Sequence, residues 1–406
     1  MAASSSARGC TTSADALQLP FTCSLATGQP LADALPSRPA ALVRSHSITW
    51  SDVAAGIMLN NGVLREGRAV GGRASLEREL LLRSRRTWMP HAPGLDILLL
   101  ASCRSEKPAG SSSRAANDNA DQPAPNPRWF PAGDEAGVGL PRMHWRCFNG
   151  RDRLGVSLWR KTGALLTVLH RTFPSKRLFL KVDSDTMLLP HALLSFLRAL
   201  HGATPRGTPL YFGSNRIASH RRFCHGRGCL LSTPRWHALA ANLSSAGTHG
   251  GDAPRDGGGS SGYCQSSEAS YAQGGAYGFD RRALGLLVRD GCLERAADLV
   301  RWHDRLRDGA EPQLFEDEAV GLCMRLRGVR LVTCGCFYDW GPCDINRPSS
   351  CSADTNASRL CHLPLTVHKL RQLSWFDGWW QLLAAREPHA LSALQSWQRT
   401  HGRAHA

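Results

Sequence analysis

Residues 179–185 (Phe-Leu-Lys-Val-Asp-Ser-Asp) join an apolar run directly to two carboxylates, Asp183 and Asp185. Large apolar and β-branched residues favour the interior of a strand, whereas an abrupt acidic pair favours its exposed end. Carboxylate oxygens are hard ligands for Mg²⁺ or Mn²⁺, and such ions keep positions open for substrate phosphates. The stretch therefore predicts a metal–diphosphate site at the end of a strand. The alternative is a plain turn, in which Asp and Ser are also common.

The segments on either side indicate α/β architecture. Residues 158–170 carry leucines at helical spacing, residues 177–182 read as the strand, and a leucine-rich helix begins near Pro190. Proline is tolerated at the first turn of a helix. In open α/β sheets, ligands bind at the carboxyl ends of the strands. This context favours the metal site over the plain turn.

A glycine-containing segment, residues 271–280, precedes a predicted helix over residues 281–289. Gly274 and Gly275 lie in its middle. Glycine lets the backbone approach a ligand closely or turn sharply. A ligand-contacting segment and a simple tight turn both fit this pattern.

Three consecutive acids, Glu316, Asp317 and Glu318, open an amphipathic helix over residues 314–324. Val320, Cys323 and Met324 are predicted to face inward. Acids at a helix N-terminus are often only dipole or capping partners. That account suits the two glutamates better than Asp317, which we expect at the mouth of the site.

Five segments together resemble glycosyltransferase family 31. Residues 179–186, 271–277 and 315–321 resemble successive signatures of that family, closest to its fringe and core 1 β1,3-galactosyltransferase branches. Residues 85–88 and 365–368 are weaker matches. All five occur in the family's order, over roughly residues 50–385.

The resemblance implies a GT-A type nucleotide-sugar-binding α/β fold with a central mixed sheet and a single catalytic domain. It implies a metal-dependent enzyme, usually using Mn²⁺, that inverts the anomeric carbon. The donor would be a UDP-sugar carrying a galactose or N-acetylglucosamine type of hexose. The acceptor would be a hydroxyl of a glycan or glycoprotein, and the product a β1,3 linkage.

The resemblance also assigns metal ligands. Asp185 would bind the ion directly, Asp183 would lie near the donor's ribose or sugar beside the metal, and His368 would complete the metal site. His362 is the substitute if the register is shifted. Ser184 lies in the donor-binding triplet, where the family pattern is most often acidic; this departure removes one charge, and the outer acids lead us to expect that metal binding survives.

Two further roles follow from the resemblance. Gly274 and Gly275 would pack near the donor sugar and the acceptor. Asp317 matches the residue proposed as general base in related enzymes. A base is needed because the acceptor hydroxyl loses its proton as it attacks.

Composition limits the alternative functions. The chain has 406 residues and a formal net charge of +16, which raises nucleic-acid binding as a possible function. Only five of its 49 basic residues are lysine, however, an arginine surplus that a biased genome would also produce. No zinc-finger or RNA-recognition spacing is present, so no nucleic-acid partner is expected. A catalytically silent glycan-binding or chaperone-like relative stays open as the second reading.

The 14 cysteines indicate the compartment. Five of them crowd into residues 334–361, and Cys224 and Cys229 flank a Gly-containing turn. Their spacing fits no standard zinc pattern, so structural disulfides are preferred. The resemblance implies the Golgi or secretory-pathway lumen and a type II membrane anchor. No apolar run near the N-terminus reaches the roughly 20 residues that a span needs, so membrane association would require an anchor not evident in this sequence.

The pattern along the chain predicts the domain organisation. Residues 52–59 and 97–101 are expected as strands, residues 76–86 as a helix, and the core resumes near Leu154. The predicted parts are a disordered or weakly ordered N-terminal segment (1–45), a GT-A-like domain (46–385) with flexible insertions (104–142 and 242–265), and a C-terminal tail (386–406).

Overall fold

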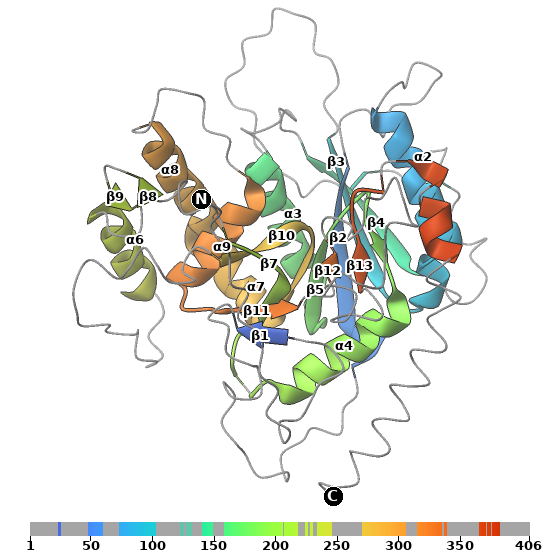
Figure 1. Ribbon diagram of the computed structural model, residues 1–406, viewed down its shortest axis with the longest axis horizontal. Helices are drawn as coiled ribbons and strands as arrows, with labels where there is room; N and C mark the ends of the chain where they lie inside the picture. Colours follow the sequence, from blue (N-terminus) through green and yellow to red (C-terminus); the bar gives the residue numbers. More distant parts are fainter. Residues whose placement is uncertain are drawn as a thin grey trace, which may run out of the picture.

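A computed structural model shows a mixed sheet covered by helices on both faces (Figure 1). The α/β fold class is therefore confirmed. The structure describes residues 23–25, 48–59, 73–102, 123–124, 127, 130, 140–148, 158–205, 207–217, 224–225, 228–229, 234–245, 270–305, 315–334, 337–338, 365–370, 372–374 and 376–381.

The central sheet has eight strands in the order β1-β11-β7-β10-β5-β2-β3-β4. Strands β5, β2, β3 and β4 are parallel to one another, and β7 is parallel to β11. Strand β10 runs antiparallel to both β5 and β7, and β1 runs antiparallel to β11. The strands are β1 (Cys23–Leu25), β2 (Val53–Leu59), β3 (Asp96–Ser102), β4 (Arg142–Phe148), β5 (Leu178–Asp183), β7 (Tyr211–Ile217), β10 (Ser270–Asp280) and β11 (Leu331–Cys334).

Two small sheets complete the strand inventory of the described residues. One joins β12 (Phe337–Tyr338), β13 (Thr366–Val367) and β6 (Met187–Leu188). The other is a hairpin of β8 (Cys224–His225) and β9 (Gly228–Cys229), in which Cys224 and Cys229 are register partners. The two residues between these strands, where the turn was predicted, lie outside the described residues.

The helices divide between the two faces of the central sheet. The described α-helices are α2 (Arg73–Arg86), α3 (Leu158–Thr172), α4 (Pro190–Ala203), α6 (Pro234–Ser245), α7 (Arg281–Val288), α8 (Cys292–Arg305) and α9 (Glu316–Leu326), and the short 3₁₀ helices are η2 (Trp50–Asp52), η3 (Met89–His91) and η6 (Arg289–Gly291). In Figure 1, α2 and α4 lie on one side of the sheet, and α7, α8 and α9 on the other.

Each face of the sheet has its own core. Successive strand residues point to opposite faces. Ala55 and Ile57 of β2 accordingly pack in the core with α2 and α4, whereas Ala54 and Met58 pack in the core with α3, α7 and α9. Because β2 is buried on both faces, it appears in the sequence as an almost continuous apolar run.

The predicted helices and strands around the acidic pair are confirmed. Residues 158–172 form α3, residues 178–183 form β5, and Pro190 opens α4. The strand and helix predictions over residues 52–59, 97–101 and 76–86 correspond to β2, β3 and α2.

The observed elements differ from the predicted organisation at three places. The core resumes not near Leu154 but at β4, whose first residue falls in the predicted insertion 104–142. An edge strand is half-buried, so β4 lacks the long apolar run that marks the buried strands. Residues 23–25 of the predicted N-terminal segment 1–45 form β1 on the opposite edge, and residues 242–245 belong to α6 rather than to a loop. The remainder of the 242–265 insertion and the tail 386–406 lie outside the described residues.

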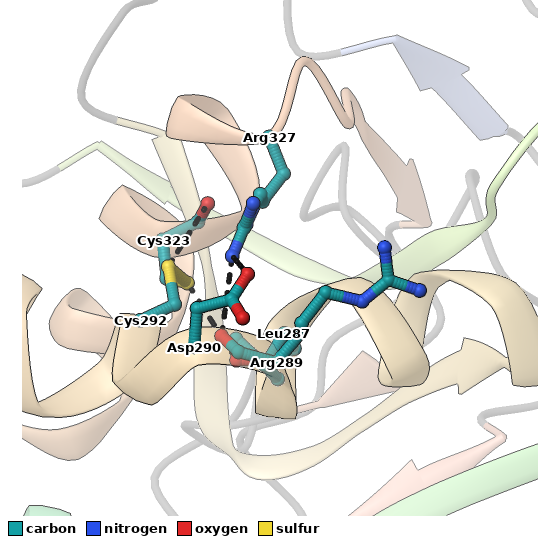
Figure 2. The surroundings of a disulfide bond; sticks show 6 residues. All are labelled: Leu287, Arg289, Asp290, Cys292, Cys323 and Arg327. Carbon is teal, nitrogen blue, oxygen red and sulfur yellow. Dashed lines mark hydrogen bonds and ion pairs between the residues drawn. A yellow bond between two sulfur atoms is a disulfide. The ribbon is translucent and has the colours of Figure 1, made fainter. Parts of the chain in front are cut away.

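A disulfide links two helices of one face. Cys292 opens α8 and Cys323 lies in α9, and their Cα atoms are 5.8 Å apart. Figure 2 shows the bond beside η6, where Arg327 donates to Asp290 and to the Arg289 carbonyl, each at 3.1 Å. The inward orientation predicted for Cys323 is confirmed, and its disulfide partner was not predicted. Most of the cysteine-rich segment 334–361 lies outside the described residues.

No helix within the described part of the chain combines the length and the apolar character that crossing a bilayer requires.

The glycine-containing segment 271–280 is a strand, β10, rather than a tight turn. Its pairing with β7 shifts register between Ala272 and Tyr277. Gly278 is needed for close packing here, because a Cβ at this position would lie 2.3 Å from the Phe212 ring.

We expect Gly278→Ala to lower the free energy of unfolding by about 1–3 kcal/mol, because the added methyl group overpacks the junction between β10 and β7. Gly202→Ala in α4 is the control, since no atom lies within 4 Å of its added Cβ, and it should stabilise the helix by about 0.5–1 kcal/mol. Urea unfolding of both variants measures the difference. Equal stability of the two would contradict the packing described for Gly278.

Candidate metal centre

The candidate metal centre lies at the carboxyl end of β5. Asp183 ends that strand, and the chain turns there, with the Thr186 amide donating to the Asp183 carbonyl at 3.1 Å. Asp185 lies in this turn. The pattern that predicted a strand with an acidic end is therefore confirmed.

Main-chain pairing brings His368 to the same place. Strand β13 pairs antiparallel with β6, and the Leu189 amide donates to the Leu365 carbonyl at 3.0 Å. Beyond the strand, the Leu370 amide donates to the Asp185 carbonyl at 3.1 Å. Backbone bonds on both sides of His368 thus fix its position relative to the acidic turn.

The three predicted ligands converge. His368 Nε2 lies 3.1 Å from Asp185 Oδ1 and 3.3 Å from Asp183 Oδ2. One ligand atom from each residue lies within 4.8 Å of the others. Adjacent ligand atoms around an octahedral ion with bonds of about 2.1 Å are about 3 Å apart. The donor set therefore fits a divalent cation.

The backbone at Gly275 packs closely against the imidazole ring of His368. A Cβ on Gly275 would lie 2.5 Å from His368 Cγ. The Gly275 carbonyl accepts a hydrogen bond from Thr186 Oγ1 at 2.9 Å, so β10 is also tied to the acidic turn. Gly274 precedes it in β10. Gly275 therefore lies beside the metal centre, where it leaves room for the imidazole ring, and its predicted packing near a donor sugar and acceptor stays a prediction.

Ser184 contacts a carboxylate that the sequence analysis missed. Its hydroxyl donates to Glu77 Oε1 of α2 at 3.1 Å, and Glu77 is buried. A glutamate on a helix with only a weak apolar stripe gives no signal of this contact.

Lys181 is the second residue that sequence reasoning missed. Its side chain is fully buried, and Nζ lies 2.5 Å from Asp183 Oδ1 and 3.2 Å from Glu316 Oε1. Burial opposes its charge, but the carboxylates of Asp183 and Glu316 outweigh burial and raise the pKa of Lys181. The available signal was the lysine itself, since a cation in an otherwise apolar strand needs a buried partner.

Asp183 is ionised in this environment. Burial opposes ionisation, but Lys181 and His368 together lower the pKa of Asp183 to about 2. A carboxylate that stays charged at all physiological pH values is suited to hold a cation.

Asp317 lies in the first turn of α9, next to Glu316, and outside the ligand set. It is buried, and its Oδ1 accepts a hydrogen bond from the Glu318 amide at 2.9 Å. Burial first, and then the neighbouring Glu316 and Glu318, raise the pKa of Asp317 well above its usual value, while Lys181 opposes the rise. The predicted position of the three acids in the first turn of a helix is confirmed. One of them, Glu316, contacts Lys181, which in turn contacts Asp183 of the metal centre.

No protein-family model matches this sequence, and the comparison with curated proteins finds no match either.

We expect Asp185→Asn and His368→Ala each to weaken Mn²⁺ binding by at least tenfold, since even outer-shell partners of metal ligands are worth about 10–100-fold. Asp290→Asn and His237→Ala are the controls. Asp290 pairs with Arg327 in another part of the fold, and His237 is exposed on α6. Electron paramagnetic resonance of free Mn²⁺ during titration measures the affinity. Unchanged Mn²⁺ affinity in both variants would contradict the assignment of these residues as metal ligands.

Gly275→Ala should also weaken Mn²⁺ binding by about tenfold, because the new methyl group displaces the imidazole that completes the site. In a His368→Ala background, the same change should have no further effect on affinity. The double-mutant cycle separates displacement of His368 from general damage to β10. Equal losses in the two backgrounds would contradict this account.

Proposed function

We propose that this chain is an inverting, metal-dependent glycosyltransferase. It would move a hexose of the galactose or N-acetylglucosamine type from a UDP-sugar to a hydroxyl of a glycan or glycoprotein, forming a β1,3 linkage. The observation that carries the proposal is the convergence of Asp183, Asp185 and His368 at the carboxyl edge of an α/β sheet. This edge is where nucleotide ligands bind in open α/β folds.

The roles follow from the chemistry of transfer. Asp183, Asp185 and His368 would hold the ion, which when bound supplies a Lewis acid for the diphosphate leaving group. Asp317 would accept the proton of the attacking hydroxyl, a role worth about 10²–10⁴-fold in rate. Its raised pKa makes it a stronger base once it is ionised. The proposed setting is the Golgi or secretory-pathway lumen, which agrees with the disulfide between Cys292 and Cys323.

A second candidate is a catalytically silent, glycan-binding relative. Two observations favour it: Asp317 is driven toward its protonated form by burial and two neighbouring acids, and the middle position of the acidic triplet is Ser184. UDP release from UDP-galactose and UDP-N-acetylglucosamine, with and without Mn²⁺, separates the two functions. Metal-dependent release supports the enzyme, whereas sugar binding without release supports the silent relative.

We expect Asp317→Asn to abolish transfer and to leave UDP binding nearly unchanged, because the amide keeps the shape of the side chain but cannot accept the proton. The wild-type rate should fall as the pH is lowered through the raised pKa of Asp317, since only the carboxylate form is a base. UDP release across a pH series measures both effects, with Asp290→Asn as the control. Normal turnover in Asp317→Asn would exclude this residue as the base.

A further inference from the structure

Lys181 is a buried cation that the proposed reaction does not use. Its ammonium group contacts Asp183 at 2.5 Å and Glu316 at 3.2 Å, and the Tyr277 ring centroid lies 5.3 Å away. Asp183 belongs to the metal centre on β5, whereas Glu316 opens α9. Lys181 therefore connects two parts of the fold that are distant in the sequence.

The two oxygens of Asp183 face different partners. Oδ1 accepts a hydrogen bond from Lys181, and Oδ2 faces His368 at 3.3 Å. A cation held by Oδ2 and His368 therefore has no need to displace Lys181. Charge-assisted hydrogen bonds are short and directional, and the dry surroundings strengthen them. The chain Asp183–Lys181–Glu316 is thus compatible with an occupied metal centre.

We infer that Lys181 is a positioning residue, which ties the first turn of α9 to the metal centre. Asp317 follows Glu316 in that turn, so a displacement of Glu316 also moves Asp317. The disulfide at Cys323 holds a later turn of the same helix. The importance of the tie for catalysis rests on the proposed function, whereas the tie itself is a property of β5 and α9.

A buried lysine beside buried acids also neutralises charge, and a double variant separates neutralisation from positioning. Lys181→Met combined with Glu316→Gln removes one positive and one negative charge, so the local sum is unchanged. The double variant nevertheless loses the contacts of Lys181 that connect Asp183 of β5 with Glu316 of α9. If neutralisation were the whole role, the double variant would behave like the wild type.

Hydrogen exchange of the full chain, followed by mass spectrometry over residues 315–326, tests the tie. We expect exchange to become about tenfold faster or more in Lys181→Met and in the double variant, because a charge-assisted bond holding the helix start is lost. Glu316→Gln alone should give a smaller increase, since its amide oxygen still accepts from Lys181. Glu294→Gln, at an exposed acid of α8, is the matched control and should exchange like the wild type.

Wild-type exchange in the double variant would overturn the inference, and this result stays decisive even if Lys181→Met alone fails to fold. Where transfer is measurable, the double variant should lower kcat at least tenfold when donor and Mn²⁺ are added to saturation, so that weaker binding of either does not contribute. Lost protection with an unchanged kcat would overturn the link to Asp317. Failure of the proposed function would appear separately, as no UDP release by the wild type with any donor.

Discussion

The antiparallel pairing of β13 with β6 is the interaction on which the metal centre depends. The strand β6 follows the acidic turn directly, so any chain paired with it lies beside Asp183 and Asp185. His368 comes one residue after the paired strand and is held on its far side by the bond between Leu370 and Asp185. The pairing of these two short strands thus brings the distant His368 to the two neighbouring carboxylates, and the three side chains form one set of ligands.

The antiparallel strand β10 also contacts the metal centre. It pairs with β5 over residues that include Lys181, and its Gly275 leaves the space that the His368 ring fills. A parallel strand in this position would reach the carboxyl edge with its own last residues. The reversed direction instead brings the beginning and middle of β10 there, which is why a glycine segment far from either strand end contacts the site.

Features that depend on residues close together in the sequence could be predicted, whereas contacts between distant segments could not. The acidic end of β5 and the acidic start of α9 are local patterns, and both were predicted correctly. His368 was placed only through the resemblance to a known family, because nothing near it in the sequence indicates which strand it will pair with. The contacts of Lys181 with Glu316 and of Ser184 with Glu77 depend on how distant elements pack. The edge strand β4 was missed because partial exposure removes the apolar run by which buried strands are found, and β1 was missed because it is only three residues long.

The charges around the centre explain why its parts are interdependent. Asp183, Glu316 and Asp317 place acidic groups in a poorly solvated region, where carboxylates repel each other unless a cation is present. Lys181 supplies one positive charge from within the strand, and its carboxylate partners keep it protonated. Lys181 holds Asp183 ionised, whereas burial and the adjacent Glu316 and Glu318 raise the pKa of Asp317 in spite of Lys181. One lysine therefore neutralises only part of the buried acidic cluster, and Asp317 of α9 differs from Asp183 in its protonation.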